Sequence, residues 1–592
     1  MKNIRISKLT LIMLFLVTLV SCSDDFLEQT NPNQLSTDSF WKTVDDLNVG
    51  LVATYKSFSS DNNYMLLDEL VRSDLAWGTG WQRPFNVNDL YLQTYNEASK
   101  QGQDKWSQLY TTIFRANQVI EAADRLKGTL NSETEEAEAE VVKAQATFIR
   151  GFSYFILSTT FNEGKVVLWD VVPGGENGFY RSVSSAQEIK DFYRADLEYA
   201  KETLPIKWED EREKGRITAG AAEAVLGQSY LAENDFSKAA VYFKNVIENY
   251  GYALTSNIGS NFTTMDELNE ESILEIVRST DFKGELNQWD WRDTGASSLQ
   301  QRLTPIGGWN GGVVANWLIL EYKNEALDYA DPRNKIIAED GSESFRKFSL
   351  RTSWSVALVD DPALEYYGSP TTAEAHHFQN KMSCYWRKHT NWDLGFESEA
   401  ARSPGKVRSG INERLIRLAE IYLQYSECLI ELGDVDGAMM YINKVRRRSG
   451  VQLLGLNGTG EFPLNDHDNV AYDATSLMKH LRFKEYPLEL SCEGHGGTRN
   501  VDLRRWGVKG QRFVELAAKR YKGENYEWTK EDGTAGPTRW GSVIVEVSPD
   551  DDTVDPAWNE FQEAAVNYNE DENGYWKLPN GETITNPVLG DE

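Results

Sequence analysis

The chain has 592 residues, of which 61 are lysine or arginine and 91 are aspartate or glutamate, so its formal net charge at pH 7 is −30. A charge this negative repels nucleic acid and anionic lipid surfaces, which excludes both as partners of the chain as a whole. The length allows several domains or one large helical superstructure.

The N-terminal segment predicts an exported lipoprotein. Cationic residues within 1–8 precede an apolar run over 9–20, which is too short to span a bilayer but has the length of a secretory h-region. The run ends at Cys22, in a context that resembles the lipobox of bacterial lipoproteins, where the cysteine becomes the acylated first residue. Residues 23–25, Ser-Asp-Asp, resemble the acidic export tag that sends Bacteroidetes lipoproteins to the outer face of the outer membrane. We therefore expect residues 1–21 to be a signal peptide and Cys22 to carry a lipid anchor.

The body of the chain is predicted to be mostly α-helical. Apolar residues recur at spacings of three and four, as on the buried face of a helix. The predicted helical segments are 106–126, 141–155, 186–204, 217–250 and 412–448. Strand-like patterns are short, as at 165–168 and 542–545.

Two of the helical segments share one pattern. Each has a turn followed by a small residue and two larger apolar residues, and the offset between the two copies is constant. The two sets are Ala239, Phe243 and Val246, and Ala438, Ile442 and Val445. A small residue at a crossing lets two helices approach closely, which is typical of a tetratricopeptide-like hairpin, although generic amphipathic helices would give part of the pattern.

Long irregular stretches interrupt this scaffold. One is rich in glycine, tryptophan and polar residues and covers 255–409, and a second begins near residue 522. We expect three regions after the signal: 22–254 with the first repeats, 255–409 as the ligand-binding insertion, and 410–592 with the later repeat. Binding residues concentrate in such insertions on a repeat scaffold.

Two segments have the chemistry of a neutral-glycan site, in which aromatic rings stack on the apolar faces of sugars and polar side chains bind the hydroxyl groups. The first contains Arg72, Asp74, Trp77 and Trp81, and the second contains Trp289, Trp291, Trp309 and Asn310. A core position is equally compatible with each single tryptophan, and for Trp317, inside an apolar run, packing is favoured.

A charged block near the C-terminal third is interpreted as architectural. Glu485, Glu489 and Glu493 recur at the i,i+4 spacing of a helix face, which would let them meet Arg499 and Arg505. Nothing in the sequence supplies a tuned partner for acid–base catalysis.

Neither a catalytic motif nor a metal site is predicted. The sequence has no HExxH, no G-x-S-x-G and no P-loop. Residues 569–574 match the first half of a calcium loop, but position twelve is Asn580, so a plain acidic turn is favoured. Cys384, Cys428 and Cys492 remain once Cys22 is lipidated. Cys428 fits a buried helix position, and a Cys384–Cys492 disulfide is left open.

Ordered blocks along nearly the whole chain resemble the SusD/RagB family of outer-membrane nutrient-binding lipoproteins. They include Trp106 to Ile120, Ala144 to Phe155 and Ile416 to Glu420. The most specific block runs from Glu485 to Trp506, and the tail 578–587 is typical as well. The chain departs from the family at Lys484, where an arginine is usual, in the longer turn at 494–498, and in its last three residues.

The resemblance implies a mostly helical, SusD-like body with about four tetratricopeptide-like pairs and an irregular ligand-binding half. It implies a partner, a SusC-like TonB-dependent transporter on which the lipoprotein sits as a hinged lid, and it implies no catalysis and no cofactor. The expected ligand is a glycan. A peptide, as in the RagB branch, is the alternative, and a surface glycoside hydrolase is the rival from another functional class.

Overall fold

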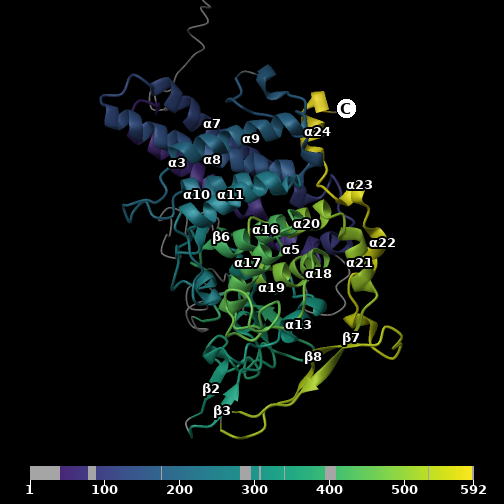
Figure 1. Ribbon diagram of the computed structural model, residues 1–592. Helices are drawn as coiled ribbons and strands as arrows, with labels where there is room; N and C mark the ends of the chain where they lie inside the picture. Colours follow the sequence, from purple (N-terminus) through teal and green to yellow (C-terminus); the bar gives the residue numbers. More distant parts are fainter. Residues whose placement is uncertain are drawn as a thin grey trace, which may run out of the picture.

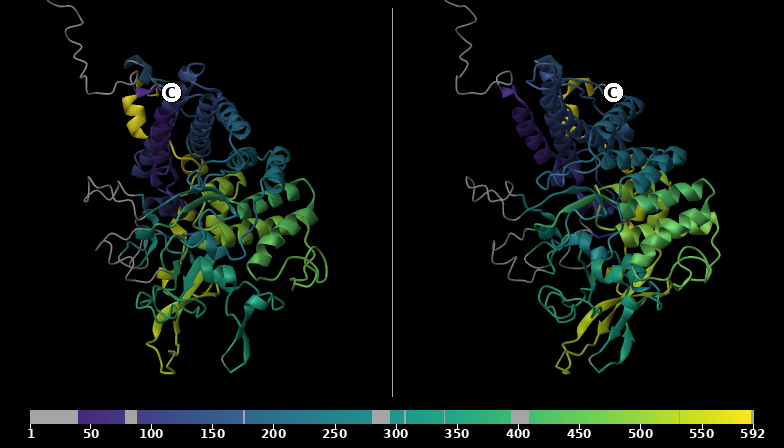
Figure 2. Two further views of the ribbon diagram at one scale, coloured as in Figure 1. Left: turned by 90° about the vertical axis from the view of Figure 1, so that its left-hand side faces the viewer. Right: turned by 60° about the vertical axis from the view of Figure 1, so that its left-hand side comes forward.

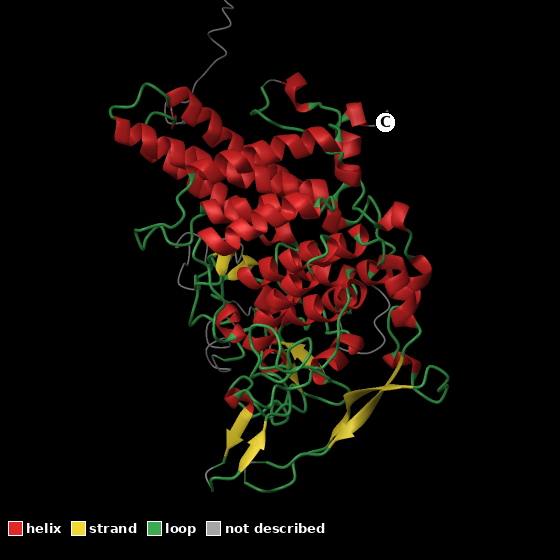
Figure 3. Ribbon diagram, in the orientation of Figure 1, coloured by secondary structure: helices red, strands yellow, loops and turns green. Residues whose placement is uncertain are grey.

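The computed structural model describes residues 40–77, 88–174, 176–279, 295–305, 308–338, 340–393, 409–530 and 532–589. About half of the chain is helical and the strands are few and short, which confirms the predicted mostly-α fold (Figures 1 and 3). The N-terminal half contains α3 Val44–Phe58, α4 Asp61–Tyr64, α5 Leu66–Arg72, α6 Asp89–Leu92, α7 Lys100–Leu126, α8 Glu133–Thr160, α9 Ala186–Thr203, α10 Ala219–Leu231, α11 Phe236–Asn249, β1 Ser272–Ile276 and α12 Leu299–Leu303.

The middle of the chain contains α13 Asn316–Lys323, β2 Lys335–Ile337, β3 Glu343–Phe345, α14 Leu350–Ser355, β4 Val356–Leu358, β5 Cys384–Trp386, β6 Glu413–Arg417, α16 Leu418–Glu431 and α17 Val435–Arg448. The rest contains α18 Ala474–His480, a π-turn η7 Leu481–Glu485, α19 Tyr486–Leu490, α20 Thr498–Arg505, α21 Lys509–Ala517, β7 Arg520–Tyr526, β8 Arg539–Val547, α22 Gln562–Asn567, α23 Glu570–Asn573 and α24 Asn580–Thr585.

The helices form stacked layers (Figures 1 and 2). The long helix α8 packs against α7 on one side and α9 on the other, and its Phe148 and Phe152 are fully buried. The α10–α11 hairpin follows, and α11 packs on α16 of the second hairpin. None of the helices within the described ranges is long and apolar enough to cross a bilayer.

The predicted pair of repeats is confirmed as two helical hairpins, α10–α11 and α16–α17. Asp235 and Asp434 cap the second helix of each hairpin by accepting a hydrogen bond from a backbone N–H of its first turn. Close approach is needed at Gly227, where a Cβ atom would lie 2.5 Å from Cε1 of Phe243. All six apolar residues shared by the two copies are fully buried.

In the part of the chain that the structure describes, the strands pair in four two-stranded antiparallel ribbons. β1 pairs with β6 and joins the irregular middle of the chain to the second repeat. The predicted helix over 412–448 is therefore wrong at its start, because residues Glu413–Arg417 are the strand β6. The ribbons β2–β3 and β7–β8 extend from the end of the molecule opposite the long helices (Figure 3). The strand predicted at 542–545 lies within β8, whereas 165–168 contributes a single bridge between Val167 and Val183.

Candidate functional site

The structure corrects the prediction that Arg72 binds ligand. Its guanidinium is buried, where it donates to the Glu69 carboxylate at 3.0 Å, the Tyr95 hydroxyl at 2.7 Å and the Asn573 carbonyl at 3.1 Å. Glu69 also accepts from Lys105 Nζ at 2.8 Å. Glu69 and Arg72 both belong to α5, Lys105 belongs to α7 and Asn573 to α23, so the buried Arg72–Glu69 pair ties α5 to α7 and to the C-terminal segment.

Asp74 is also structural and not a ligand contact. Its fully buried carboxylate accepts two hydrogen bonds of 2.8 Å from Arg499 and one of 3.0 Å from Arg512. Burial by itself would raise the pKa of this carboxyl, but the two guanidinium groups outweigh burial and lower the pKa to about 2. Asp74 therefore fastens the end of α5 to α20 and α21.

Trp77 is likewise a core residue, with 1% of its surface exposed. Its indole N–H donates to the Glu560 carboxylate, and its ring stacks on Tyr91 with centroids 6.0 Å apart and planes at 10°. The packing expected for Trp317 is confirmed, because that side chain is buried and its indole donates to the Asp74 carbonyl.

Trp309 is one of the tryptophans predicted to stack on a sugar, and the structure leaves 57% of its surface accessible. Its backbone N–H donates to the Gln301 carbonyl at 2.8 Å, and the next two N–H groups donate to carbonyls at Thr304 and Arg302 at 3.1 and 2.6 Å. The side chain of the neighbouring Asn310 is buried, and the residue has a left-handed φ of 47°. The tight backbone turn holds the loop, so the indole is presented outward from a fixed base.

A strip of charged side chains runs beside this turn, along α12. Arg302 pairs with Asp68 of α5 at 2.7 Å, and both side chains are partly exposed. Just before α12, Ser298 donates to Asp61, which also pairs with Arg278 at 2.6 Å. We call Trp309, Arg302 and Asp68 the Trp309 surface. It combines one exposed aromatic face with a fixed donor and a fixed acceptor, which is the chemistry that binds a sugar ring.

The other predicted tryptophans, Trp81, Trp289 and Trp291, lie outside the described residues, as does Cys22. The described residues that flank these predicted segments do come together. Ala76 bridges to Val314, close to Trp309, and Ser297 bridges to Ser409 with a backbone hydrogen bond of 2.8 Å. The Ala76–Val314 bridge therefore joins the described end of the first predicted segment to the residues that follow Trp309.

The charged block is architectural, as predicted, but its partners differ from those expected. Glu485, Glu489 and Glu493 are buried, and Glu493 lies beyond the end of α19 instead of on the same helix face. They pair with buried cations from distant segments, including Arg417, which contacts Glu489 at 2.8 Å and Glu493 at 2.6 Å. Arg505 instead binds Glu427 and Asp502.

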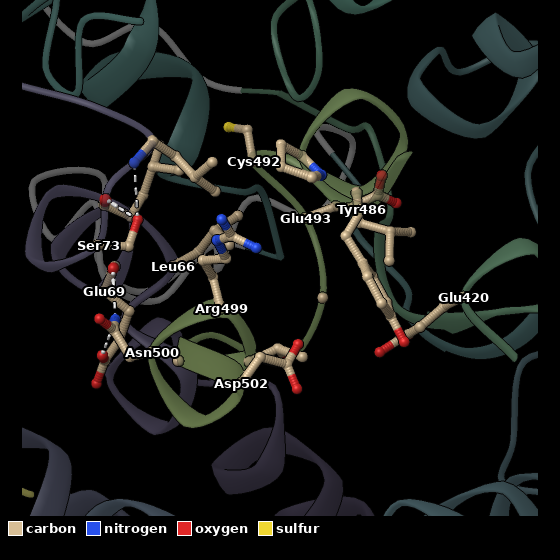
Figure 4. Close-up of a pocket in the computed structure, with 17 residues that line it drawn as sticks. Leu66, Glu69, Ser73, Glu420, Tyr486, Cys492, Glu493, Arg499, Asn500 and Asp502 are labelled. Carbon is tan, nitrogen blue, oxygen red and sulfur yellow. Dashed lines mark hydrogen bonds between the residues drawn. The ribbon is translucent and has the colours of Figure 1, made fainter. Parts of the chain in front are cut away.

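A small cavity lies between α5, α16, α19 and α20 (Figure 4). Its volume is about 50 Å³, which holds a few water molecules and excludes a sugar. Burial, together with the nearby Glu493 carboxylate, raises the pKa of Glu420 at its wall to about 8. This cavity is therefore too small to be a glycan site.

Within the described ranges, no group of three or more His, Cys, Asp and Glu side chains is arranged to hold a metal ion. The segment considered as a calcium loop is the short helix α23, in which the Asn569 side chain caps the backbone at Asp571. Cys384, Cys428 and Cys492 are buried free thiols, so the Cys384–Cys492 bridge is not formed.

Sequence reasoning did not identify Arg302 and Asp68, because neither lies in an aromatic or glycine-rich context. It also did not single out Trp208, which lines a second and larger pocket. The available signal was a lone tryptophan between charged residues, Lys207 and Glu209, in a connection between two helices.

A family model described as the SusD family matches residues 270–589, and one described as "Starch-binding associating with outer membrane" matches residues 25–231. SusD-like protein P2 of Formosa agariphila is 26% identical over 500 residues, which cover 82% of this chain and 88% of that protein. A SusD superfamily structure from Bacteroides vulgatus has a TM-score of 0.66 and 22% identity, and covers 93% of this chain and 98% of its own. A laminarin-binding SusD-like protein has a TM-score of 0.58 and 21% identity, and covers 80% and 94% respectively.

Proposed function

Because this chain belongs to the SusD family, we propose that it is a cell-surface lipoprotein that binds a glycan and passes it to a SusC-like TonB-dependent transporter. The printed names of related proteins support a carbohydrate ligand, since one similar structure is a laminarin-binding protein. The description of the family model over residues 25–231 supports association with the outer membrane.

The observation that carries the proposal is the Trp309 surface. An indole that is 57% exposed on a backbone-fixed turn is ready to stack on a sugar without reorganising. Arg302 lies on α12, to whose backbone the turn is bonded, and its pair with Asp68 at 2.7 Å offers a donor and an acceptor for hydroxyl groups. Stacking on such an exposed ring contributes about 1–2 kcal/mol.

The binding is proposed to involve no bond cleavage. A glycosidase needs two carboxyl groups about 5–10 Å apart that flank a scissile bond in an accessible cleft. The block of Glu485, Glu489 and Glu493 is buried and occupied by ion pairs. The Trp309 surface offers one carboxylate, Asp68, which is bound to Arg302. These groups suit recognition of hydroxyls better than proton transfer.

Anchoring through Cys22 and docking of the helical repeats on the transporter complete the proposal. A lipidated Cys22 supplies the membrane affinity, and the acidic residues after it direct the protein outward. Stacked helical hairpins present an extended surface to a large partner.

Cys22→Ala should release the chain from the membrane fraction. Mild detergent extraction of the wild type should co-purify a partner of transporter size, and a strictly solitary protein would count against docking.

Affinity electrophoresis tests the ligand class. Full-length protein is run in gels that contain laminarin, xyloglucan or starch, with a parallel reducing-sugar assay and a peptide-binding panel. Retardation by at least one polysaccharide without release of reducing ends is the expected result. Release of reducing ends would make the protein a hydrolase, and binding of peptides alone would make it a peptide-binding lid.

A further inference from the structure

A second pocket lies at the base of the first helical repeat, away from the Trp309 surface. The connection between α9 and α10, the end of α11 and the strand β1 enclose it, with a volume of about 410 Å³. This volume falls in the range of small-ligand sites, about 300–1,000 Å³. The pocket could hold the end of a glycan or a short oligosaccharide, whereas the 50 Å³ cavity at Glu420 could not.

Three aromatic side chains line this pocket: Trp208, Tyr250 and Tyr252. The two tyrosine rings stack with centroids 6.4 Å apart and planes at 19°. The Trp208 indole donates to the Ile217 carbonyl at 3.1 Å, which fixes the plane of its ring. All three side chains are partly exposed, and the Arg216 guanidinium lies over the Trp208 ring, 5.9 Å from its centroid. Partly exposed aromatic rings beside polar groups have the chemistry that binds sugar rings.

The walls of the pocket are held in place before any ligand arrives. Gly215 has a left-handed φ of 96°, and a Cβ there would lie 2.9 Å from Cγ2 of Val277 beyond β1. The Ile217 N–H donates to the Tyr55 hydroxyl at 3.0 Å, and the Ala253 N–H donates to the Glu270 carbonyl at 2.9 Å. A pre-formed wall lowers the entropy cost of binding.

The charges at the pocket balance. Lys214 lies 3.7 Å from Glu211, and Arg216 is paired with Glu213. The lining holds three cationic residues, Lys207, Lys214 and Arg216, and three anionic residues, Glu211, Glu270 and Glu275. A balanced lining does not select a polyanion, so the aromatic faces favour an uncharged ligand.

We propose that this pocket is a second glycan subsite, which binds a neutral sugar unit by stacking on Trp208. The inference rests on the proposed function, because it assigns a further site for the same class of ligand. The subsite shares no residue with the Trp309 surface. Residues Ser272 to Glu275 of β1 line the pocket. Arg278, which follows β1 in the sequence, instead pairs with Asp61 in the strip beside α12. One lipoprotein could then hold a long glycan at two points, which raises avidity without tight binding at either.

The test compares the full-length wild type with Trp208→Ala, Trp309→Ala and the double variant, all in mild detergent. Titration calorimetry with the neutral probes laminarihexaose, maltoheptaose and xyloglucan oligosaccharides, and with oligogalacturonate as the charged probe, is paired with a thermal melt. Trp540→Ala, which removes an exposed ring on β8, is the matched control. Each single variant should weaken binding about tenfold at its own subsite. Trp309→Ala should keep residual binding that the double variant loses, and Trp208→Phe should restore most of what Trp208→Ala loses.

The outcomes separate this inference from the proposed function. If Trp208→Ala titrates like the wild type and the double variant like Trp309→Ala, the second subsite is refuted while glycan binding stands. If Trp208→Ala lowers the melting temperature in step with affinity, Trp208 is a packing residue and the subsite is also refuted. If no oligosaccharide binds the wild type, both proposals fall. Preference of the pocket for oligogalacturonate over the neutral probes would overturn the assigned ligand class.

Discussion

The segments that carry Trp77 and Trp309 lie side by side, yet they bury their tryptophans to opposite degrees. Each tryptophan follows a short helix and has a glycine next to it in the sequence. A bridge between Ala76 and Val314 joins the two segments. Even so, Trp77 is 1% exposed and Trp309 is 57% exposed. Local context therefore did not decide which ring would reach the solvent.

The difference has a physical cause in the partners of each indole. Trp77 points toward Glu560, which accepts its N–H and also accepts backbone N–H groups at the start of α13. A buried acceptor and a stacked Tyr91 make the core the better place for this ring. At Trp309 the hydrogen bonds to α12 are made by the backbone, so the turn is fixed while the ring stays outside. Trp77 therefore stabilises the core, whereas the ring of Trp309 is accessible to solvent.

The largest expected loss of stability follows substitution of Asp74, whose carboxylate holds the Trp77 segment against α20 and α21. Asp74→Ala leaves Arg499 and Arg512 without their buried carboxylate and should lower the free energy of unfolding by about 3–5 kcal/mol. Denaturant unfolding measures the loss. The control is Glu248→Ala, whose carboxylate lies in an exposed pair with Lys244 at 3.9 Å and should change stability by less than about 1 kcal/mol. Equal losses would mean that the Asp74 pairs do not hold the segment.

The two tryptophans should respond differently to the same truncation. Trp77→Ala removes a buried ring and should cost about 3–5 kcal/mol of unfolding free energy. Trp309→Ala removes an exposed ring and should stay within about 0.5 kcal/mol of the wild type. Thermal or denaturant unfolding of both variants measures the two losses of stability. Similar losses would contradict the conclusion that Trp77 is a core residue and Trp309 a surface residue.

Acid should lower the stability of the folded chain, because it protonates the Asp74 carboxylate that holds the Trp77 segment. The pKa of this carboxyl is 3.8 without the protein environment and about 2 in the folded chain, because the two arginines outweigh burial. A lowered pKa contributes stability that is fully present above about pH 4 and is lost as the pH falls through 2. Asp74→Asn should therefore flatten the fall in melting temperature between pH 4 and pH 2. An unchanged slope would show that the carboxylate is not held in its charged form.

A pH dependence of opposite sign is expected at Glu420. Burial and the nearby Glu493 raise its pKa from 4.5 to about 8, so folding favours the protonated acid. Stability from this group is present below pH 4.5 and is lost as the pH rises toward 8. Glu420→Gln keeps the neutral form and should reduce the decline in melting temperature between pH 5 and pH 8. A decline as steep as that of the wild type would contradict the assignment.

The fold was largely predictable, because long helices and their repeat leave a periodic record in the sequence. Ala239 and Ala438 mark helix crossings that the structure places in the core. The role of Asp74 was not predictable, because its partners Arg499 and Arg512 lie more than 400 residues away. Ion pairing across such distances carries no local pattern. The same holds for Glu489, which meets Arg417 and not the arginines nearest in sequence.

The exposed member of the tryptophan pair offers the most direct test of ligand binding. Titration calorimetry of full-length wild type and Trp309→Ala, with laminarihexaose, maltoheptaose and xyloglucan oligosaccharides, measures the contribution of the ring to affinity. At the surface subsite, the variant should bind about tenfold more weakly than the wild type, with an unchanged melting temperature. Wild-type affinity in Trp309→Ala for every oligosaccharide that binds would contradict the account, because the exposed ring would then take no part in recognition.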